Sequence, residues 1–130
     1  MADAAHKVLL VDDDKFLADM YSMKFTQSGF EVTACLSVAE ALAALKKGLE
    51  PSAILFDIVM PVQDGFSFLQ SLRQEGLGLH AVKIALSNQS DEKDRARAIE
   101  LGADRYVVKA SMIPSEVVTI VAEEIKKKTK

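Results

Sequence analysis

The sequence contains one cysteine, Cys35, no tryptophan, and no apolar run long enough to cross a membrane. A single cysteine cannot form an internal disulfide, and no cysteine–histidine cluster has the spacing of a zinc site. The first residues lack the basic segment and apolar stretch of a signal peptide. We therefore expect a cytoplasmic protein in which Cys35 is a buried apolar side chain.

Positive charge is not in excess either, because 16 Lys and Arg residues stand against 19 Asp and Glu, a formal net charge of −3. Proteins that coat nucleic acid usually have a basic surface, so we expect no direct nucleic-acid binding. Internal repeats and linkers are also absent. With 130 residues and 49% hydrophobic content, we expect one domain over residues 1–130, with a core at about 7–128 and no output domain.

What the sequence does contain is a strict alternation of short apolar runs and longer amphipathic segments. The short runs predict strands at residues 8–11, 30–34, 53–56, 81–86 and 105–108. The amphipathic segments predict helices at residues 15–27, 38–47, 66–75, 91–101 and 114–128. This alternation indicates an α/β fold, a doubly wound sandwich with a parallel sheet and helices on both faces.

Polar residues follow four of the predicted strands at the point where each strand ends. Asp12 and Asp13 follow the first strand, and Asp57 follows the third. Ser87 and Lys109 follow the fourth and the fifth. Because the carboxyl ends of parallel strands meet at one edge of the sheet, we expect these five side chains to converge there.

Three carboxylates in one pocket repel one another, and a hard divalent cation such as Mg²⁺ removes that conflict. Carboxylates, a lysine and a hydroxyl beside Mg²⁺ are the groups of a phosphoryl-transfer site. Asp57 stands alone after its strand, so we expect it to be the nucleophile that forms an acyl phosphate. Asp12 and Asp13 are expected to hold the metal, whereas Asp14 is expected only to begin the next helix.

Four stretches together resemble a known family. They are LLVDDD (9–14), LFDIVMP (55–61) followed by Asp64 and Gly65, IALS (84–87), and GADRYVVK (102–109). In order and spacing they resemble the receiver domain of bacterial response regulators in two-component signalling. The resemblance covers nearly the whole chain and implies the CheY-like (βα)5 fold, with a five-stranded parallel sheet in the order 2-1-3-4-5.

The resemblance also implies a role for each acid. Asp57 would accept a phosphoryl group from a phosphohistidine on a sensor histidine kinase or a phosphotransfer protein. Mg²⁺ would be bound by Asp13, Asp57 and the backbone carbonyl of Val59, with Asp12 acting through water. The protein would then be a regulator rather than an enzyme, its chemistry limited to self-directed phosphotransfer and autodephosphorylation.

Three further residues would couple phosphorylation to the surface. Lys109 would pair with the phosphoryl oxygens, Ser87 would swing in to bond the phosphoryl group, and Tyr106 would rotate inward behind it. A downstream protein would then contact the face formed by segments 91–101, 105–108 and 114–128. The charges of segment 91–101 suit ion pairs in a phosphorylation-dependent dimer, although a solvated helix and a monomer explain them equally well.

Two positions depart from the family pattern. Ala110 follows the lysine, where the family usually has a proline, often after a cis peptide bond. Since a cis bond before a residue other than proline costs about 2.5–4 kcal/mol, we expect a trans bond with a rearranged loop or a strained cis bond. Asn88 stands where the family usually has a small residue, so we expect slower phosphoryl turnover.

Two other functions are compatible with part of the pattern. A phosphatase of the haloacid-dehalogenase type also uses an Asp nucleophile with Mg²⁺, and Asp12 and Asp14 have the spacing it needs. The residues that follow, Phe16 and Leu17, do not fit that family. A receiver-like docking module that is never phosphorylated is the second alternative, and the intact set of acids argues against it.

Overall fold

The computed structural model describes residues 6–128 as alternating strands and helices. The strands are β1 (Lys7–Val11), β2 (Glu31–Cys35), β3 (Ala53–Asp57), β4 (Val82–Ser87) and β5 (Arg105–Val108). The helices are α1 (Lys15–Gln27), α2 (Val38–Lys46), α3 (Gly65–Glu75), α4 (Glu92–Glu100) and α5 (Pro114–Lys128). A single 3-10 turn, Lys109–Ser111, connects β5 to α5 and was not predicted.

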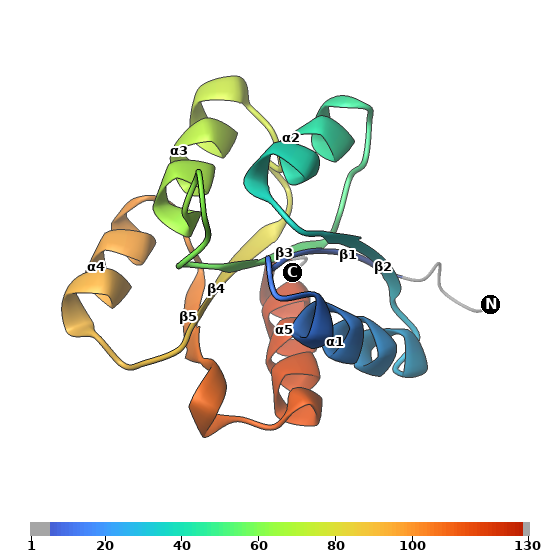
Figure 1. Ribbon diagram of the computed structural model, residues 1–130. Coiled ribbons are helices and arrows are strands. Elements are labelled where there is room, and N and C mark those ends of the chain that lie inside the picture. The colour runs from blue at the N-terminus through green and yellow to red at the C-terminus, as the bar shows by residue number, and fades with distance from the viewer. Residues whose placement is uncertain (1–5, 129–130) are drawn as a thin grey trace.

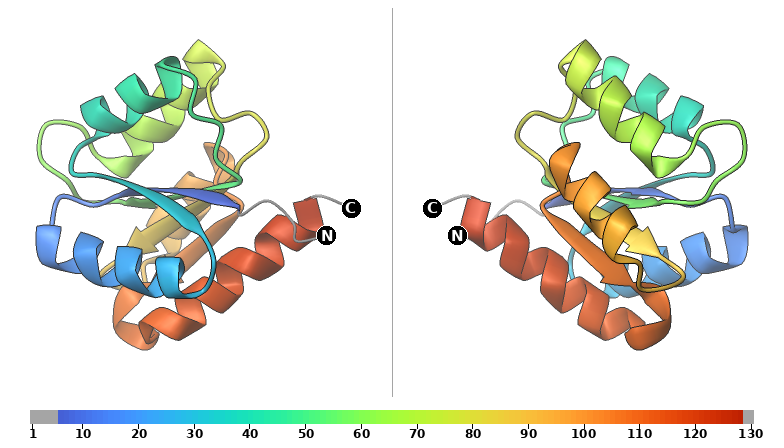
Figure 2. Two further views of the ribbon diagram at one scale, coloured as in Figure 1. Left: turned by 90° about the vertical axis from the view of Figure 1, so that its right-hand side faces the viewer. Right: turned by 90° about the vertical axis from the view of Figure 1, so that its left-hand side faces the viewer.

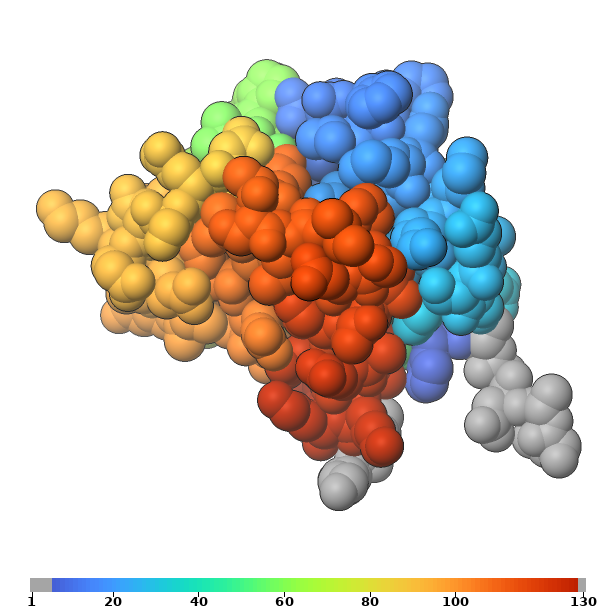
Figure 3. All heavy atoms as spheres, turned by 90° about the horizontal axis from the view of Figure 1, so that it is seen from below, coloured from blue at the N-terminus to red at the C-terminus, as the bar shows by residue number. Residues whose placement is uncertain are grey.

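The five strands form one parallel sheet in the order β2-β1-β3-β4-β5, which confirms the predicted topology. Helices α2, α3 and α4 cover one face of the sheet, and α1 and α5 cover the other (Figures 1 and 2). α1 and α5 pack against each other, and both are visible in Figure 3, where α1 is blue and α5 red. None of the described helices is long and apolar enough to span a membrane.

The sheet separates two apolar cores, and successive residues of a strand contribute to them in turn. In β1, Leu9 and Val11 face the core beneath α2 and α3, whereas Val8 and Leu10 face α1 and α5. Every residue of β3 is buried. A continuous apolar sequence in the central strands is therefore required, because both of their faces are covered.

Capping side chains define where the helices begin. The carboxylates of Asp14, Asp64 and Asp91 accept backbone N–H bonds at the starts of α1, α3 and α4. At α2 the Ser37 hydroxyl accepts from the Glu40 backbone, and the Glu40 carboxylate accepts in return from the Leu36 backbone. The predicted helix boundaries differ from the observed ones by one residue at several ends. The predicted helix at 91–101, for example, included the two cap residues Asp91 and Leu101, which lie just outside α4.

Candidate functional site

Three carboxylates and one ammonium group meet at the carboxyl edge of the sheet. One carboxylate oxygen from each of Asp12, Asp13 and Asp57 lies within 4.8 Å of the others. Lys109 Nζ lies 3.4 Å from Asp57 Oδ2 and 3.6 Å from Asp12 Oδ2. The predicted convergence of these four side chains is therefore present in the structure.

The strand register explains why the acids meet. Val11 is paired with Phe56 across β1 and β3, so the residues that follow them, Asp12 and Asp57, are neighbours. The chain then returns close to Asp57 at the start of α3, where a Cβ on Gly65 would lie 2.7 Å from the Asp57 carbonyl oxygen. Gly65 N–H donates to Ile58 O at 2.8 Å. Only glycine allows this close approach. The hydrogen bond from Gly65 to Ile58 then holds the segment after Asp57 against the start of α3.

Burial controls the charge of the two inner acids. Asp12 is fully buried, and Asp57 is 5% exposed. The pKa of Asp57 is raised from 3.8 to about 6. Burial is the largest cause, the ammonium of Lys109 acts against it, and the Asp12 carboxylate acts with it. Burial also raises the pKa of Asp12, against the hydrogen bond that its carboxylate accepts from the Asp14 backbone. The site thus holds two carboxylates whose ionised forms are costly without an added cation.

Tyr21 belongs to the surroundings of the site, and sequence reasoning did not single it out. It is a buried residue of α1, and the pKa of its phenol is raised by burial and then by the charges of Asp12 and Asp57. Its position in a helix made it indistinguishable from an ordinary core aromatic. Only the three-dimensional arrangement shows that its hydroxyl lies within the field of the acids.

The donor set fits a divalent cation. Asp12 Oδ2 and Asp57 Oδ1 are buried and accept no hydrogen bond, and Asp12 Oδ2 has only the Lys109 ammonium 3.6 Å away. This state is expensive for carboxylate oxygens unless a further cation is bound. Asp13 is exposed, so the pocket is open to solvent on that side. Hard carboxylate oxygens around an open position suit Mg²⁺, which retains part of its water shell. Val59 lies in the connection after β3 with its side chain 71% exposed, and its carbonyl stays a predicted ligand.

Asp14 has a different task from the other two acids of its run. Its carboxylate accepts from the backbone N–H of Leu17 at 3.2 Å and caps α1, as the sequence indicated. The phosphatase alternative requires Asp12 and Asp14 to act together. In the structure Asp12 lies in the buried site, whereas Asp14 caps a helix.

Ser87 and Tyr106, the two predicted switch residues, share one acceptor. Ser87 Oγ donates to the Gln89 carbonyl oxygen at 2.8 Å, and the Tyr106 hydroxyl donates to the same oxygen at 3.1 Å. Both side chains are buried. The inward position expected of Tyr106 after phosphorylation is therefore already present here, because its hydroxyl finds a partner in the β4–α4 connection. Ser87 has turned toward its own loop.

The replacement of the usual proline does not displace the lysine. No described peptide bond is cis, so the Lys109–Ala110 bond is trans, and the chain continues into the 3-10 turn. The Lys109 side chain is only 9% exposed and lies beside both Asp12 and Asp57. Of the two expected outcomes for this bond, trans or strained cis, the trans bond is observed.

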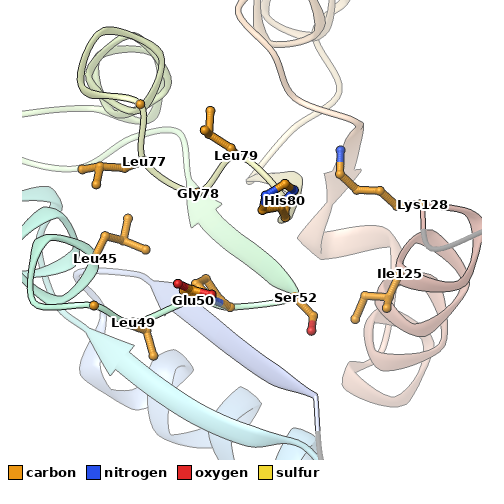
Figure 4. Close-up of a pocket in the computed structure, with 13 residues that line it drawn as sticks. Leu45, Leu49, Glu50, Ser52, Leu77, Gly78, Leu79, His80, Ile125 and Lys128 are labelled. Carbon is orange, nitrogen blue, oxygen red and sulfur yellow. The ribbon is translucent and has the colours of Figure 1, made fainter.

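A hollow of about 530 Å³ lies at the opposite edge of the sheet, where the strands begin (Figure 4). Its wall comes from the ends of α2 and α5, from the α2–β3 connection and from the loop before β4, and its apolar side chains include Leu45, Leu49, Leu77, Leu79 and Ile125. Three of its polar members, Glu50, His80 and Lys128, are exposed. None of the predicted site residues lines it.

Curated proteins with similar sequences are transcriptional regulators. The transcriptional regulatory protein PrrA of Mycobacterium tuberculosis is 36% identical over 116 residues, which cover 89% of this chain and 48% of that protein. The transcriptional regulatory protein GltR of Pseudomonas aeruginosa is 33% identical over 109 residues, covering 84% of this chain and 45% of that protein. The chain thus spans less than half the length of these relatives.

Solved structures agree with the sequence matches. The receiver domain of the Francisella response regulator 1452 has a TM-score of 0.83 at 30% identity, over 96% of this chain and 99% of that one. Chemotaxis protein CheY4 of Vibrio cholerae has a TM-score of 0.85 at 27% identity, over 92% and 98% of the two chains. Residues 8–122 match the response regulator receiver domain family. The chain therefore belongs to the response regulator receiver domains, the phosphoacceptor switches of two-component systems.

Proposed function

We propose that Asp57 is the phosphoacceptor of this receiver and that the chain reports its phosphorylation through a change of surface. The observation that supports this most strongly is the position of Asp57, buried between a lysine ammonium and two further carboxylates at the end of a central strand. Above pH 6 its carboxylate is mostly ionised, since its pKa is about 6. A nucleophile is therefore present at neutral pH.

The chemistry follows from these groups. A carboxylate oxygen of Asp57 bonds to phosphorus as the P–N bond of a phosphohistidine breaks, and the electron pair of that bond stays on the imidazole nitrogen. The ammonium of Lys109, 3.4 Å from Asp57 Oδ2, offsets charge on the transferred oxygens. Bound by Asp13, Asp57 and the Val59 carbonyl, with Asp12 acting through water, Mg²⁺ would supply further positive charge at those oxygens. The phosphoryl group leaves later by hydrolysis, so the only substrate is the protein itself.

The phosphodonor is a sensor histidine kinase or a phosphotransfer protein, and its contact surface surrounds the acids. Exposed apolar side chains follow β1, β3 and β5 at the carboxyl edge: Phe16 is 77% exposed, Val59 71%, Val62 105% and Ile113 61%. A protein donor gains affinity by covering such side chains, whereas a small acyl phosphate does not. With a kinase as donor, we assign the protein to the cytoplasm.

The output passes through Gln89. When Ser87 turns to the phosphoryl group, the Gln89 carbonyl keeps the Tyr106 hydroxyl as its remaining donor, and the β4–α4 connection is free to move. The surface of α4, β5 and α5 changes with it, and a downstream protein reads the change. We assign no nucleic-acid contact to this chain, whose net charge is −3, and the single-domain organisation stays a prediction.

A small acyl phosphate with Mg²⁺ tests the proposal. Intact mass should show one added phosphoryl group on the wild-type chain and none on Asp57→Asn, and amide spectra should shift around α4 and β5 in the wild type alone. A chain that neither gains mass nor shifts supports the docking-module alternative. Steady release of phosphate from a generic ester supports the phosphatase alternative.

A further inference from the structure

α4 is attached to the rest of the molecule in an unusual way. Among its nine residues only Ala98 is buried, so the helix offers the sheet almost no apolar face. Its two arginines lie instead over aromatic rings of neighbouring elements. The guanidinium of Arg95 lies 5.0 Å from the ring centre of Tyr106 on β5, and that of Arg97 lies 4.3 Å from the ring centre of Phe66 on α3. Figure 2 shows α4 beside β5.

Tyr106 is thereby held at two places by two different segments. Its hydroxyl donates to the Gln89 carbonyl in the β4–α4 connection, and the face of its ring is covered by Arg95 of α4. The other charged contact of Arg95 is a long ion pair, with 3.8 Å between its Nε and Glu92 Oε2, and its side chain is 44% exposed. A guanidinium over an aromatic face is attracted by the ring quadrupole.

We propose that Arg95 is a positioning residue of the switch: its guanidinium stabilises the inward position of Tyr106 before phosphorylation. The Gln89 carbonyl then has its tyrosine partner in place when Ser87 leaves it for the phosphoryl group. The consequence for phosphorylation rests on the proposed function, whereas the effect on Tyr106 itself does not. Arg97 has the same charge and the same helix but contacts a different ring, so it provides a matched control.

A contact of this kind at a partly exposed site corresponds to a factor of about two to five in an equilibrium. Loss of Arg95 should therefore lower the ratio of inward to outward Tyr106 by about that factor. The protein has two tyrosines and no tryptophan, so fluorotyrosine labelling gives two ¹⁹F signals, and the variant Tyr106→Phe assigns them. The shift of the Tyr106 signal between H₂O and D₂O reports its exposure.

The test compares Arg95→Met, which keeps the aliphatic cover but removes the charge, with Arg95→Lys and Arg97→Met. We expect Tyr106 to become more exposed in Arg95→Met, less so in Arg95→Lys, and to keep its wild-type exposure in Arg97→Met. An unchanged Tyr106 signal in Arg95→Met, or an equal change in Arg97→Met, would overturn the proposal. Thermal melts of all variants exclude those that do not fold.

A second readout uses beryllofluoride with Mg²⁺ as the phosphoryl probe. If inward Tyr106 favours the phosphorylated state, Arg95→Met needs a higher half-saturating concentration, by no more than about five-fold. A lower half-saturating concentration in Arg95→Met would contradict the proposal. If the wild type does not bind the probe at all, the proposed function fails, and the exposure of Tyr106 alone decides the role of Arg95.

Discussion

Replacing Asp57 with asparagine should make the metal-free protein more stable at neutral pH, although it removes the phosphoacceptor. The carboxyl is 5% exposed, and burial raises its pKa from 3.8 to about 6. Between these two values the unfolded chain releases the proton while the folded chain retains it. Stability therefore falls as pH rises from about 4 to 6, and the loss is complete above pH 6.

The magnitude follows from the pKa values. At about 1.4 kcal/mol for each pKa unit, ionisation of Asp57 costs the folded protein about 3 kcal/mol. Asparagine has the shape of the neutral carboxyl and avoids this cost. Urea unfolding with a chelator at pH 7 should therefore show Asp57→Asn more stable by about 3 kcal/mol, and the difference should vanish near pH 4.

The matched control is Asp19→Asn, which changes the net charge equally at a side chain that is 67% exposed. It should alter stability by no more than about 1 kcal/mol at any pH. Added Mg²⁺ should stabilise the wild type and not Asp57→Asn. The difference in unfolding free energy between the two proteins should therefore become smaller. If Asp57→Asn were less stable than the wild type at pH 7 without metal, the reasoning on burial and charge would be refuted.

Four further predictions concern the surroundings of the site. Gly65→Ala should destabilise the fold by about 1–3 kcal/mol in urea unfolding, because the new Cβ would lie 2.7 Å from the Asp57 carbonyl; an unchanged midpoint would contradict this close approach. Val62 is a β-branched residue at φ 70° with a fully exposed side chain. Val62→Asn should raise the free energy of unfolding by about 1 kcal/mol in the same assay, since asparagine tolerates the left-handed region, and a loss of stability would argue against strain there. Phe16→Ala should slow phosphotransfer from a kinase but not from a small acyl phosphate, and equal slowing with both donors would remove Phe16 from the docking surface. Asn88→Ala should speed loss of the phosphoryl group, measured as the decay of the phosphorylated mass, and an unchanged rate would exclude a role for Asn88 in turnover.

The fold and the main site were predictable because both depend on where strands end. A strand that is buried on both faces can be recognised in the sequence as a continuous apolar run. In a parallel sheet, the polar residues that follow such runs all lie at the same edge of the sheet. The position of Asp57 beside Lys109 follows from that rule and from nothing more detailed. The role of Asp14 at the start of α1 was equally local.

Side-chain orientation was not predictable in the same way. Tyr106 points inward with its hydroxyl on the Gln89 carbonyl oxygen, and no sequence pattern places that oxygen. The stacking of Arg95 on Tyr106 joins two elements through a contact between a charged and an aromatic residue, whereas periodicity describes only apolar faces. The 3-10 turn at Lys109–Ser111 was not predicted, and sequence reasoning left the Lys109–Ala110 bond open between a trans and a cis geometry.

The central claim is that Asp57 forms an acyl phosphate, and reduction of that bond tests it most directly. Borohydride converts an aspartyl phosphate to homoserine, which peptide mass analysis locates in the chain. After incubation with a small acyl phosphate and Mg²⁺, the account predicts homoserine at position 57 of the wild type and at no position of Asp57→Asn. Homoserine at Asp12 or Asp13, or none in a wild-type chain that binds Mg²⁺, would contradict it.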